Sequence, residues 1–140
     1  MPDIKYLTDT IIPQIRQLQN QHFYLPSYIM MMQAIEYLGS VLDKKPLKAR
    51  EQSKKRFSLA LKKLFDSPYH YYNRNNEIYD KLRNHLLHTF STGNYFEIMP
   101  ASEAGDNKHL TKSNDGRIIL ISEEMLRDIE KAASKVTHVS

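Results

Sequence analysis

Apolar residues recur at helical spacing through the first half of the chain. Between residues 4 and 18 they predict an amphipathic helix, which Pro13 should kink or restart. A second stripe predicts a helix that begins with Ser27 as its N-cap and ends before Pro46. Because apolar side chains cover most of this helix's circumference, we expect it at the centre of a bundle or against a second copy of the chain.

Two further helices are predicted before residue 93. One spans residues 47–65, and its apolar residues gather in its second half. Ser67 and Pro68 should end it, and residues 69–72 read as an aromatic connector. The next helix spans residues 75–90 and ends in a polar, glycine-containing turn.

The pattern changes after this turn. Residues 95–99 have the pattern of a strand, and residues 109–113 and 117–121 flank an Asn-Asp-Gly turn that is typical of a hairpin. Ser122 then caps a last amphipathic helix. We therefore expect a mostly α protein: an up-and-down four-helix bundle over residues 1–93, followed by a small β-hairpin and a C-terminal docking helix (residues 94–140) packed on the same domain.

Length and composition agree with this expectation. A chain of 140 residues fits one domain, and fifteen leucines against three valines favour helices over a β-sandwich. The absence of cysteine excludes disulfides and thiolate chemistry and favours a reducing, cytoplasmic setting. The longest apolar runs are four residues, so we expect no membrane span.

Basic charge is concentrated in one segment. Residues 44–63 hold nine basic residues against Glu51, whereas the whole chain has a net charge of +4. Such a segment is either a solvated helix face or a patch for an acidic partner, most commonly nucleic acid. The residues that we expect to contact RNA are Lys48, Arg50, Lys54, Lys55, Arg56, Lys62 and Lys63.

The predicted helix over residues 75–90 carries the most informative residues. At about 100° per residue, Arg83 falls inside its apolar arc, where a permanent cation needs an acidic partner, a ligand or an interface. Asn84 and His88 lie four residues apart on one flank. Glu36 is a candidate acidic partner for Arg83, although a solvent-exposed Glu36 is an equally good interpretation.

The order Arg83-Asn84-x-x-x-His88 resembles the Arg-x4-6-His motif, often with Asn after Arg, of the HEPN superfamily (higher eukaryotes and prokaryotes nucleotide-binding domains). The resemblance covers residues 4–93 and implies a small helical bundle. Many members are metal-independent ribonucleases of toxin–antitoxin, phage-defence and RNA-processing systems. The resemblance therefore implies an endoribonuclease with no cofactor, a cytoplasmic homodimer whose two copies share one cleft, and a possible antitoxin or regulatory protein as partner.

The chemistry of these residue types is consistent with that implication. In metal-free cleavage the 2′-hydroxyl attacks the adjacent phosphate, and the imidazole of His88 suits the proton transfers. The guanidinium of Arg83 can stabilise the charge of the phosphorane, and Asn84 can bind the phosphate or orient His88. The expected product is a 2′,3′-cyclic phosphate.

Two residues near the motif are candidates for a supporting role. Tyr79 and Asp80 lie one turn before Arg83 and Asn84, although a packed tyrosine and a surface carboxylate explain them as well. The histidines show no paired spacing typical of a metal site, so we predict no metal. Two alternatives to a nuclease stay open: a non-catalytic module that binds RNA, a nucleotide or a protein partner, and a purely structural oligomerising bundle.

Overall fold

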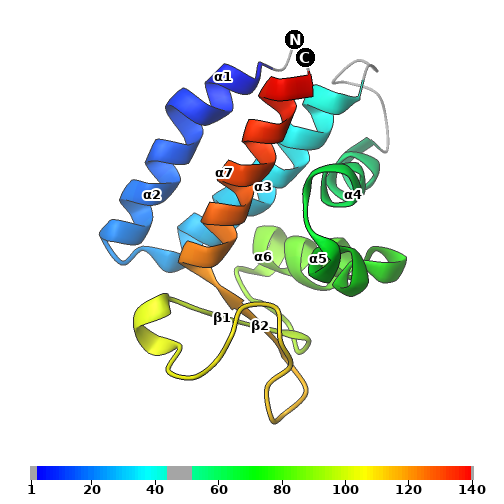
Figure 1. The fold of residues 1–140 in the computed structure, drawn as a ribbon. Coiled ribbons are helices and arrows are strands. Elements are labelled where there is room, and N and C mark those ends of the chain that lie inside the picture. Colours follow the sequence, from blue (N-terminus) through cyan, green and yellow to red (C-terminus); the bar gives the residue numbers. More distant parts are fainter. Residues whose placement is uncertain (1–2, 44–51, 140) are drawn as a thin grey trace.

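Residues 3–43 and 52–139 are described in a computed structural model of the chain (Figure 1). The first helical rod consists of α1 (Ile4–Tyr6), a π-helical turn η1 (Leu7–Ile11) and α2 (Ile12–Asn20). Pro13 lies in the first turn of α2, where a backbone N–H has no partner within the helix, so proline is tolerated there. The Ile12 N–H donates to the Leu7 carbonyl, five residues back, which is the hydrogen bond of a π-helical turn. In place of the predicted kink or restart at Pro13, the helical path continues through this π-helical turn.

Helix α3 (Tyr24–Leu42) lies at the centre of the molecule and packs against α2, α4 and α7. It begins three residues earlier than predicted, so Ser27 is not the N-cap. The Ser27 side chain is buried and donates to the Tyr24 carbonyl at 2.7 Å. The fully buried side chains of its wide apolar face are those of Tyr28, Met31, Met32, Ile35 and Leu38.

Helix α4 (Gln52–Leu64) crosses α3 at very close range. A Cβ atom built on Gly39 would lie 1.8 Å from the carbonyl oxygen of Arg56, so only glycine fits at this point. Residues 69–72, expected to be a connector, belong to a short helix, α5 (Ser67–Tyr72), and Tyr69 packs into the core.

The predicted helix over residues 75–90 is broken into shorter pieces. A 3-10 turn η2 (Arg74–Asn76) precedes a π-helical turn η3 (Tyr79–Arg83) and helix α6 (Asn84–Thr89). Asn75 and Asn76 have φ angles of 56° and 60°, and Phe90 ends α6 with a φ of 56°. These left-handed residues interrupt the helical path at both ends.

The small sheet differs from the predicted hairpin. Strand β1 (Phe96–Met99) pairs in parallel with β2 (Ile118–Ile121), in the register Phe96–Ile118. The predicted turn forms, with the Gly116 N–H donating to Ser113 at 3.0 Å. Leu110 has a φ of 60°, which interrupts the extended conformation. The expected second strand is reduced to an antiparallel bridge between Lys112 and Ile118 and a few backbone hydrogen bonds between residues 110–113 and 117–119. A 3-10 turn η4 (Ala101–Glu103) follows β1.

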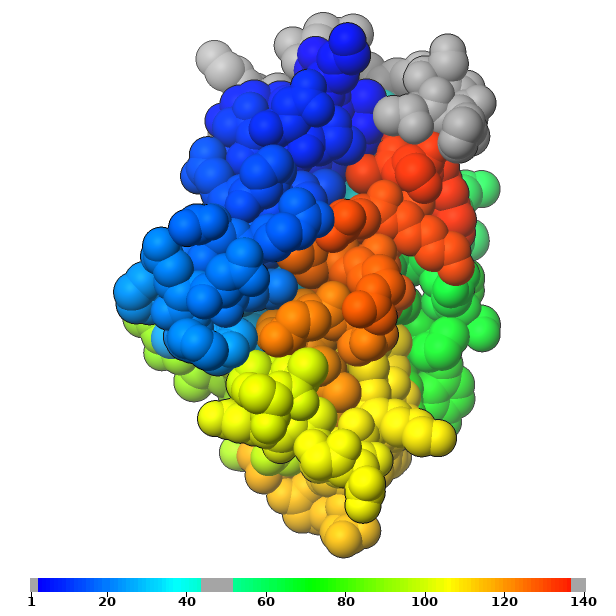
Figure 2. Space-filling view, turned by 60° about the vertical axis from the view of Figure 1, so that its left-hand side comes forward, coloured from blue at the N-terminus to red at the C-terminus, as the bar shows by residue number. Residues whose placement is uncertain are grey.

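Helix α7 (Ser122–Val139) returns through the middle of the molecule and contacts α2, α3 and α4 (Figures 1 and 2). Its buried side chains are Met125, Leu126, Ile129, Ala132, Ala133 and Val136, which belong to the same core as α3 and α4. The protein is therefore mostly helical, as predicted, but the four-helix bundle over residues 1–93 is not confirmed. The apolar face of α7 fills the core beside α2 and α3, where the bundle alone would leave a gap.

Candidate functional site

Arg83 and Asn84 lie where a π-helical turn meets helix α6. The Asn84 N–H donates to the carbonyl of Tyr79, five residues earlier. This wider turn inserts one extra residue into the helix, and such insertions are common at functional sites. It gathers Tyr79, Arg83 and Asn84 at one point of the fold.

The guanidinium of Arg83 is held by two oxygens. Its Nη2 lies 3.2 Å from Oε1 of Glu36 on α3, and its Nη1 donates to Oδ1 of Asn84 at 3.0 Å. Its carbon also lies 4.8 Å from the centre of the Tyr79 ring. The Arg83 side chain is 15% exposed and that of Glu36 is 27% exposed, so this is a half-shielded ion pair rather than a solvated one.

Ser53 on α4 completes this group. Its hydroxyl donates to Glu36 and lies 2.6 Å from the Tyr79 hydroxyl, which can donate to it in turn. We call Glu36, Ser53, Tyr79, Arg83 and Asn84 the arginine cluster. Sequence reasoning missed Ser53, because only the close crossing of α3 and α4 brings it here and no motif marks it.

The arginine cluster does not use every donor of Arg83. Within residues 3–43 and 52–139 the Nε of Arg83 is buried and has no hydrogen-bond partner. The guanidinium has five N–H groups, and the contacts to Glu36 and Asn84 use one on each terminal nitrogen. One further N–H on each terminal nitrogen is left for a bidentate acceptor.

His88 lies five residues after Arg83, near the end of α6. Its side chain is exposed, and it has no contact with the arginine cluster among the described residues. At 1.5 Å per residue the two backbone positions are about 7.5 Å apart along the helix. One copy of the chain therefore brings Arg83 and Asn84 together but leaves the imidazole in solvent.

Asp80 faces away from the arginine cluster. It forms an ion pair with Lys54 at 3.1 Å, and both side chains are about half-exposed. The Lys54 ammonium also lies 5.7 Å from the centre of the Tyr79 ring. Asp80 thus positions a lysine beside the cluster instead of contacting Arg83.

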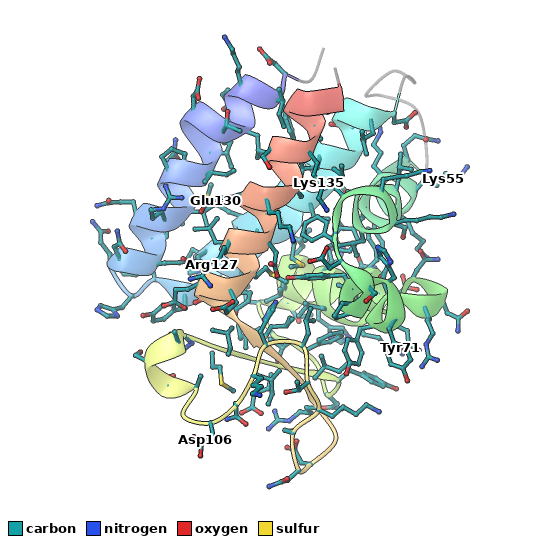
Figure 3. All side chains as sticks on the ribbon, in the orientation of Figure 1. Lys55, Tyr71, Asp106, Arg127, Glu130 and Lys135 are labelled. Atoms are coloured by element: carbon teal, nitrogen blue, oxygen red, sulfur yellow. The ribbon has the colours of Figure 1, made fainter. Side chains whose placement is uncertain are left out.

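The basic residues divide into groups. Lys55, Lys62 and Lys63 are exposed on α4, and Lys55 extends from the edge of the molecule in Figure 3. Arg56 is buried and its Nε donates to Asp43 at 3.1 Å, so the expectation that it contacts RNA needs correction: it joins α4 to the end of α3. Lys48 and Arg50 lie outside the described residues.

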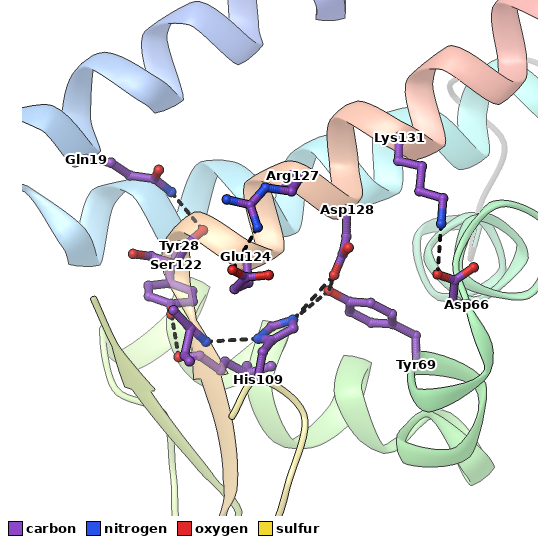
Figure 4. Close-up of polar contacts among 12 residues, drawn as sticks. Gln19, Tyr28, Asp66, Tyr69, His109, Ser122, Glu124, Arg127, Asp128 and Lys131 are labelled. Carbon is purple, nitrogen blue, oxygen red and sulfur yellow. Dashed lines mark hydrogen bonds and ion pairs between the residues drawn. The ribbon is translucent and has the colours of Figure 1, made fainter. Parts of the chain in front are cut away.

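A second polar cluster joins Tyr69, His109 and Asp128 (Figure 4). The Tyr69 hydroxyl donates to Asp128 at 2.6 Å and lies 2.8 Å from Nε2 of His109. The Nδ1 of His109 accepts the N–H of Ile121 at 3.0 Å, so its proton is on Nε2. The three side chains contact one another, and the cluster connects the loop before β2 to α5 and α7.

Burial and hydrogen bonding set the ionisation of this second cluster. Burial raises the pKa of Tyr69, and the neighbouring charge of Asp128 raises it further. Burial also acts to raise the pKa of Asp128, but the hydrogen bonds from His109 and Tyr69 outweigh it and lower that pKa. The carboxylate form of Asp128 is therefore part of the folded state.

A cavity of about 480 Å³ lies beside this second cluster. Its wall includes the carboxylates of Asp66, Glu124 and Asp128. In the described part of the chain, no three or more His, Asp or Glu side chains are grouped closely enough to hold a metal ion. No described helix has the length and apolarity that a membrane crossing requires.

Comparison with protein-family models, with curated proteins and with solved structures finds no match for this chain.

Proposed function

We propose that this protein is a metal-independent endoribonuclease of the HEPN type. The observation that carries the proposal is the arginine cluster, in which Glu36 and Asn84 hold a guanidinium that keeps N–H groups in reserve. An exposed imidazole, that of His88, follows on the same helical segment. A positioned cation and a solvent-reachable acid–base group are the two components that metal-free phosphodiester cleavage requires.

The reaction uses the 2′-hydroxyl of the RNA as the nucleophile. His88 removes its proton, O2′ attacks the adjacent phosphorus, and two phosphorane oxygens accept hydrogen bonds from the remaining N–H groups of Arg83. The O5′ leaving group takes a proton from an imidazolium or from water. The products are a 2′,3′-cyclic phosphate on one fragment and a 5′-hydroxyl on the other.

The proposed site is shared by two copies of the chain. His88 and the arginine cluster are separate within one copy, and a second copy across a two-fold axis would bring another imidazole to the same cleft. The end of α6 supports this arrangement because the Phe90 ring is 68% exposed there. An exposed phenyl ring beside the site is a suitable anchor for a dimer contact.

Cleavage of single-stranded RNA in the presence of a chelator tests the proposal. We expect His88→Asn to reduce the rate by about 10²–10⁴-fold, the usual contribution of a general acid or base. The matched control is His22→Asn: His22 is exposed and far along the chain, and asparagine tolerates its φ of 64°. Equal cleavage by wild type and His88→Asn, at equal folded content, excludes the proposed site.

A non-catalytic binding module is the second candidate, and the ion pair itself favours it. Glu36 neutralises much of the charge that Arg83 would offer to a phosphate. Under this alternative the protein binds RNA, a nucleotide or a regulatory protein such as an antitoxin, with strong salt dependence for RNA. Tight RNA binding without any cleavage product would favour it over the nuclease.

A further inference from the structure

A second cavity, of about 410 Å³, lies between α4 and the turn that leads into the Arg83 segment. Its walls include Ser58 and Lys62 from α4, His70 from α5, and the side chains of Asn73, Asn75 and Asn76. This volume is within the range of about 300–1,000 Å³ that is usual for small-molecule sites. None of the described residues that line it carries a carboxylate, in contrast to the cavity beside Asp128.

A network of hydrogen bonds builds one wall. The Ser58 hydroxyl donates to Oδ1 of Asn76 at 2.5 Å and accepts from Nδ2 of Asn73 at 3.3 Å. The Oδ1 of Asn73 accepts the N–H of Ile78 at 3.1 Å. Among the described residues the Asn76 side chain only accepts, through Oδ1, so its amide N–H groups are left for another acceptor.

The backbone of this wall is held in an uncommon conformation. Asn75 and Asn76 are consecutive left-handed residues, and each such residue costs free energy when it is not glycine. The network around Asn73 and Ser58 maintains the turn. The turn places the amide side chains of Asn75 and Asn76 in the wall of one cavity, and each amide carries both hydrogen-bond donors and an acceptor.

The remaining groups suit an anion with an aromatic part. Lys62 and His70 are exposed and have no ion pair among the described residues. Tyr71, which follows His70 in the chain but is not part of the cavity lining, is 52% exposed and extends outward in Figure 3, with the Arg74 guanidinium 4.1 Å from its ring centre. Exposed aromatic rings and guanidinium planes are the surfaces on which unpaired bases stack.

We propose that this cavity binds one nucleotide of single-stranded RNA. Lys62 and His70 contact its phosphate, and the amides of Asn75 and Asn76 contact polar edges of its base. Helix α4 contributes to both places: Ser53 of the arginine cluster and Ser58 of the cavity wall are five residues apart, about 7.5 Å along the helix axis. The identity of the ligand as RNA rests on the proposed function, whereas the test below measures binding alone.

The test uses a short 2′-O-methyl oligonucleotide, which cannot be cleaved by 2′-hydroxyl attack, and measures its binding by fluorescence anisotropy. We expect Lys62→Gln to weaken binding about tenfold and to lower the slope of log affinity against log salt by about one. Asn75→Gly retains the left-handed backbone and removes the amide, and we expect a loss of about threefold to tenfold. The matched control is Lys5→Gln, which removes an exposed charge from α1, outside the basic segment and outside the cavity lining.

The outcomes separate this proposal from the nuclease. Selective loss with Lys62→Gln and Asn75→Gly supports the cavity, even if no RNA is cleaved. Competition with adenosine 5′-monophosphate then shows whether a free nucleotide suffices or a strand is required. Unchanged binding in both variants, or an equal loss with Lys5→Gln, overturns the cavity while leaving any cleavage by His88 in place.

Discussion

The Arg83 guanidinium receives its partners from two separate parts of the chain. Asn84 is its neighbour in sequence, whereas Glu36 comes from α3, 47 residues away. Local spacing placed Arg83 on an apolar face and thus indicated that it needs a partner. Which carboxylate supplies that partner depends on how α3 packs, so the sequence offered Glu36 only as one of two interpretations.

We expect Glu36→Gln to destabilise the protein. The change keeps the shape of the side chain but leaves the shielded Arg83 cation without its counter-charge, which costs about 1–3 kcal/mol. Urea denaturation measures the loss. Glu97→Gln is the control, because the Arg117–Glu97 pair is more than a third exposed on both sides and should contribute little. Equal midpoints for Glu36→Gln and wild type would contradict a stabilising ion pair.

The lowered pKa of Asp128 predicts a pH dependence of stability. A carboxyl whose pKa falls on folding stabilises the protein above its unfolded value, about 3.9, and this contribution is lost as the pH drops towards the folded value. Asp128→Asn should therefore be less stable near neutral pH and show a shallower loss below about pH 4. Urea midpoints measured across this range test it, with the exposed Asp106→Asn as control. Parallel pH profiles for Asp128→Asn and wild type would contradict the assignment.

At the scale of elements, the α3–α4 crossing depends on one missing side chain. Alanine is the better helix former and on an exposed helix would add about 0.5–1 kcal/mol of stability. At Gly39 we expect the opposite sign, a loss of about 1–3 kcal/mol, since the new Cβ would overlap the Arg56 carbonyl. Thermal or urea unfolding measures it.

Gly105→Ala is the comparison that distinguishes steric overlap of the new Cβ from backbone strain. Gly105 has a φ of 56° and open space around it, so its substitution adds strain but no overlap. We expect a smaller loss there than at Gly39. A Gly39→Ala variant as stable as wild type would show that the two helices are free to move apart.

Periodicity predicted the helical elements better than their ends. The stripes for α3, α4 and α7 were recognised because their buried faces repeat every three or four residues. The same pattern does not predict the breaks at Asn75 and Asn76, because asparagine adopts both helical and left-handed backbones. The parallel partner of β2 was also missed, since an Asn-Asp-Gly turn specifies only its local pairing.

At the scale of the whole molecule, the sequence predicted one mostly helical unit but not its arrangement. The amphipathic pattern of α7 shows that one face is buried, but it does not show which helices bury it. The site shows the same contrast. The sequence gives the spacing of Arg83 and His88, whereas only the folded structure shows that the two side chains do not meet within one copy of the chain.

A shared site requires a dimer in solution. We expect sedimentation velocity to show a dimer for the wild type and a monomer for Phe90→Asn. This substitution removes the exposed ring and tolerates the left-handed backbone of residue 90. Tyr95→Asn, which removes another exposed ring, is the comparison. A wild-type monomer at assay concentrations that still cleaves RNA would contradict the shared site.

The central claim is that RNA is cleaved by its own 2′-hydroxyl under the control of Arg83 and His88. The most direct measurement is the end chemistry of the products, in chelator, from an RNA and from the same RNA with 2′-deoxy nucleotides throughout. The account predicts 2′,3′-cyclic phosphate and 5′-hydroxyl ends from the RNA and no cleavage of the deoxy strand. Products with 3′-hydroxyl ends, or cleavage of the deoxy strand, would contradict it.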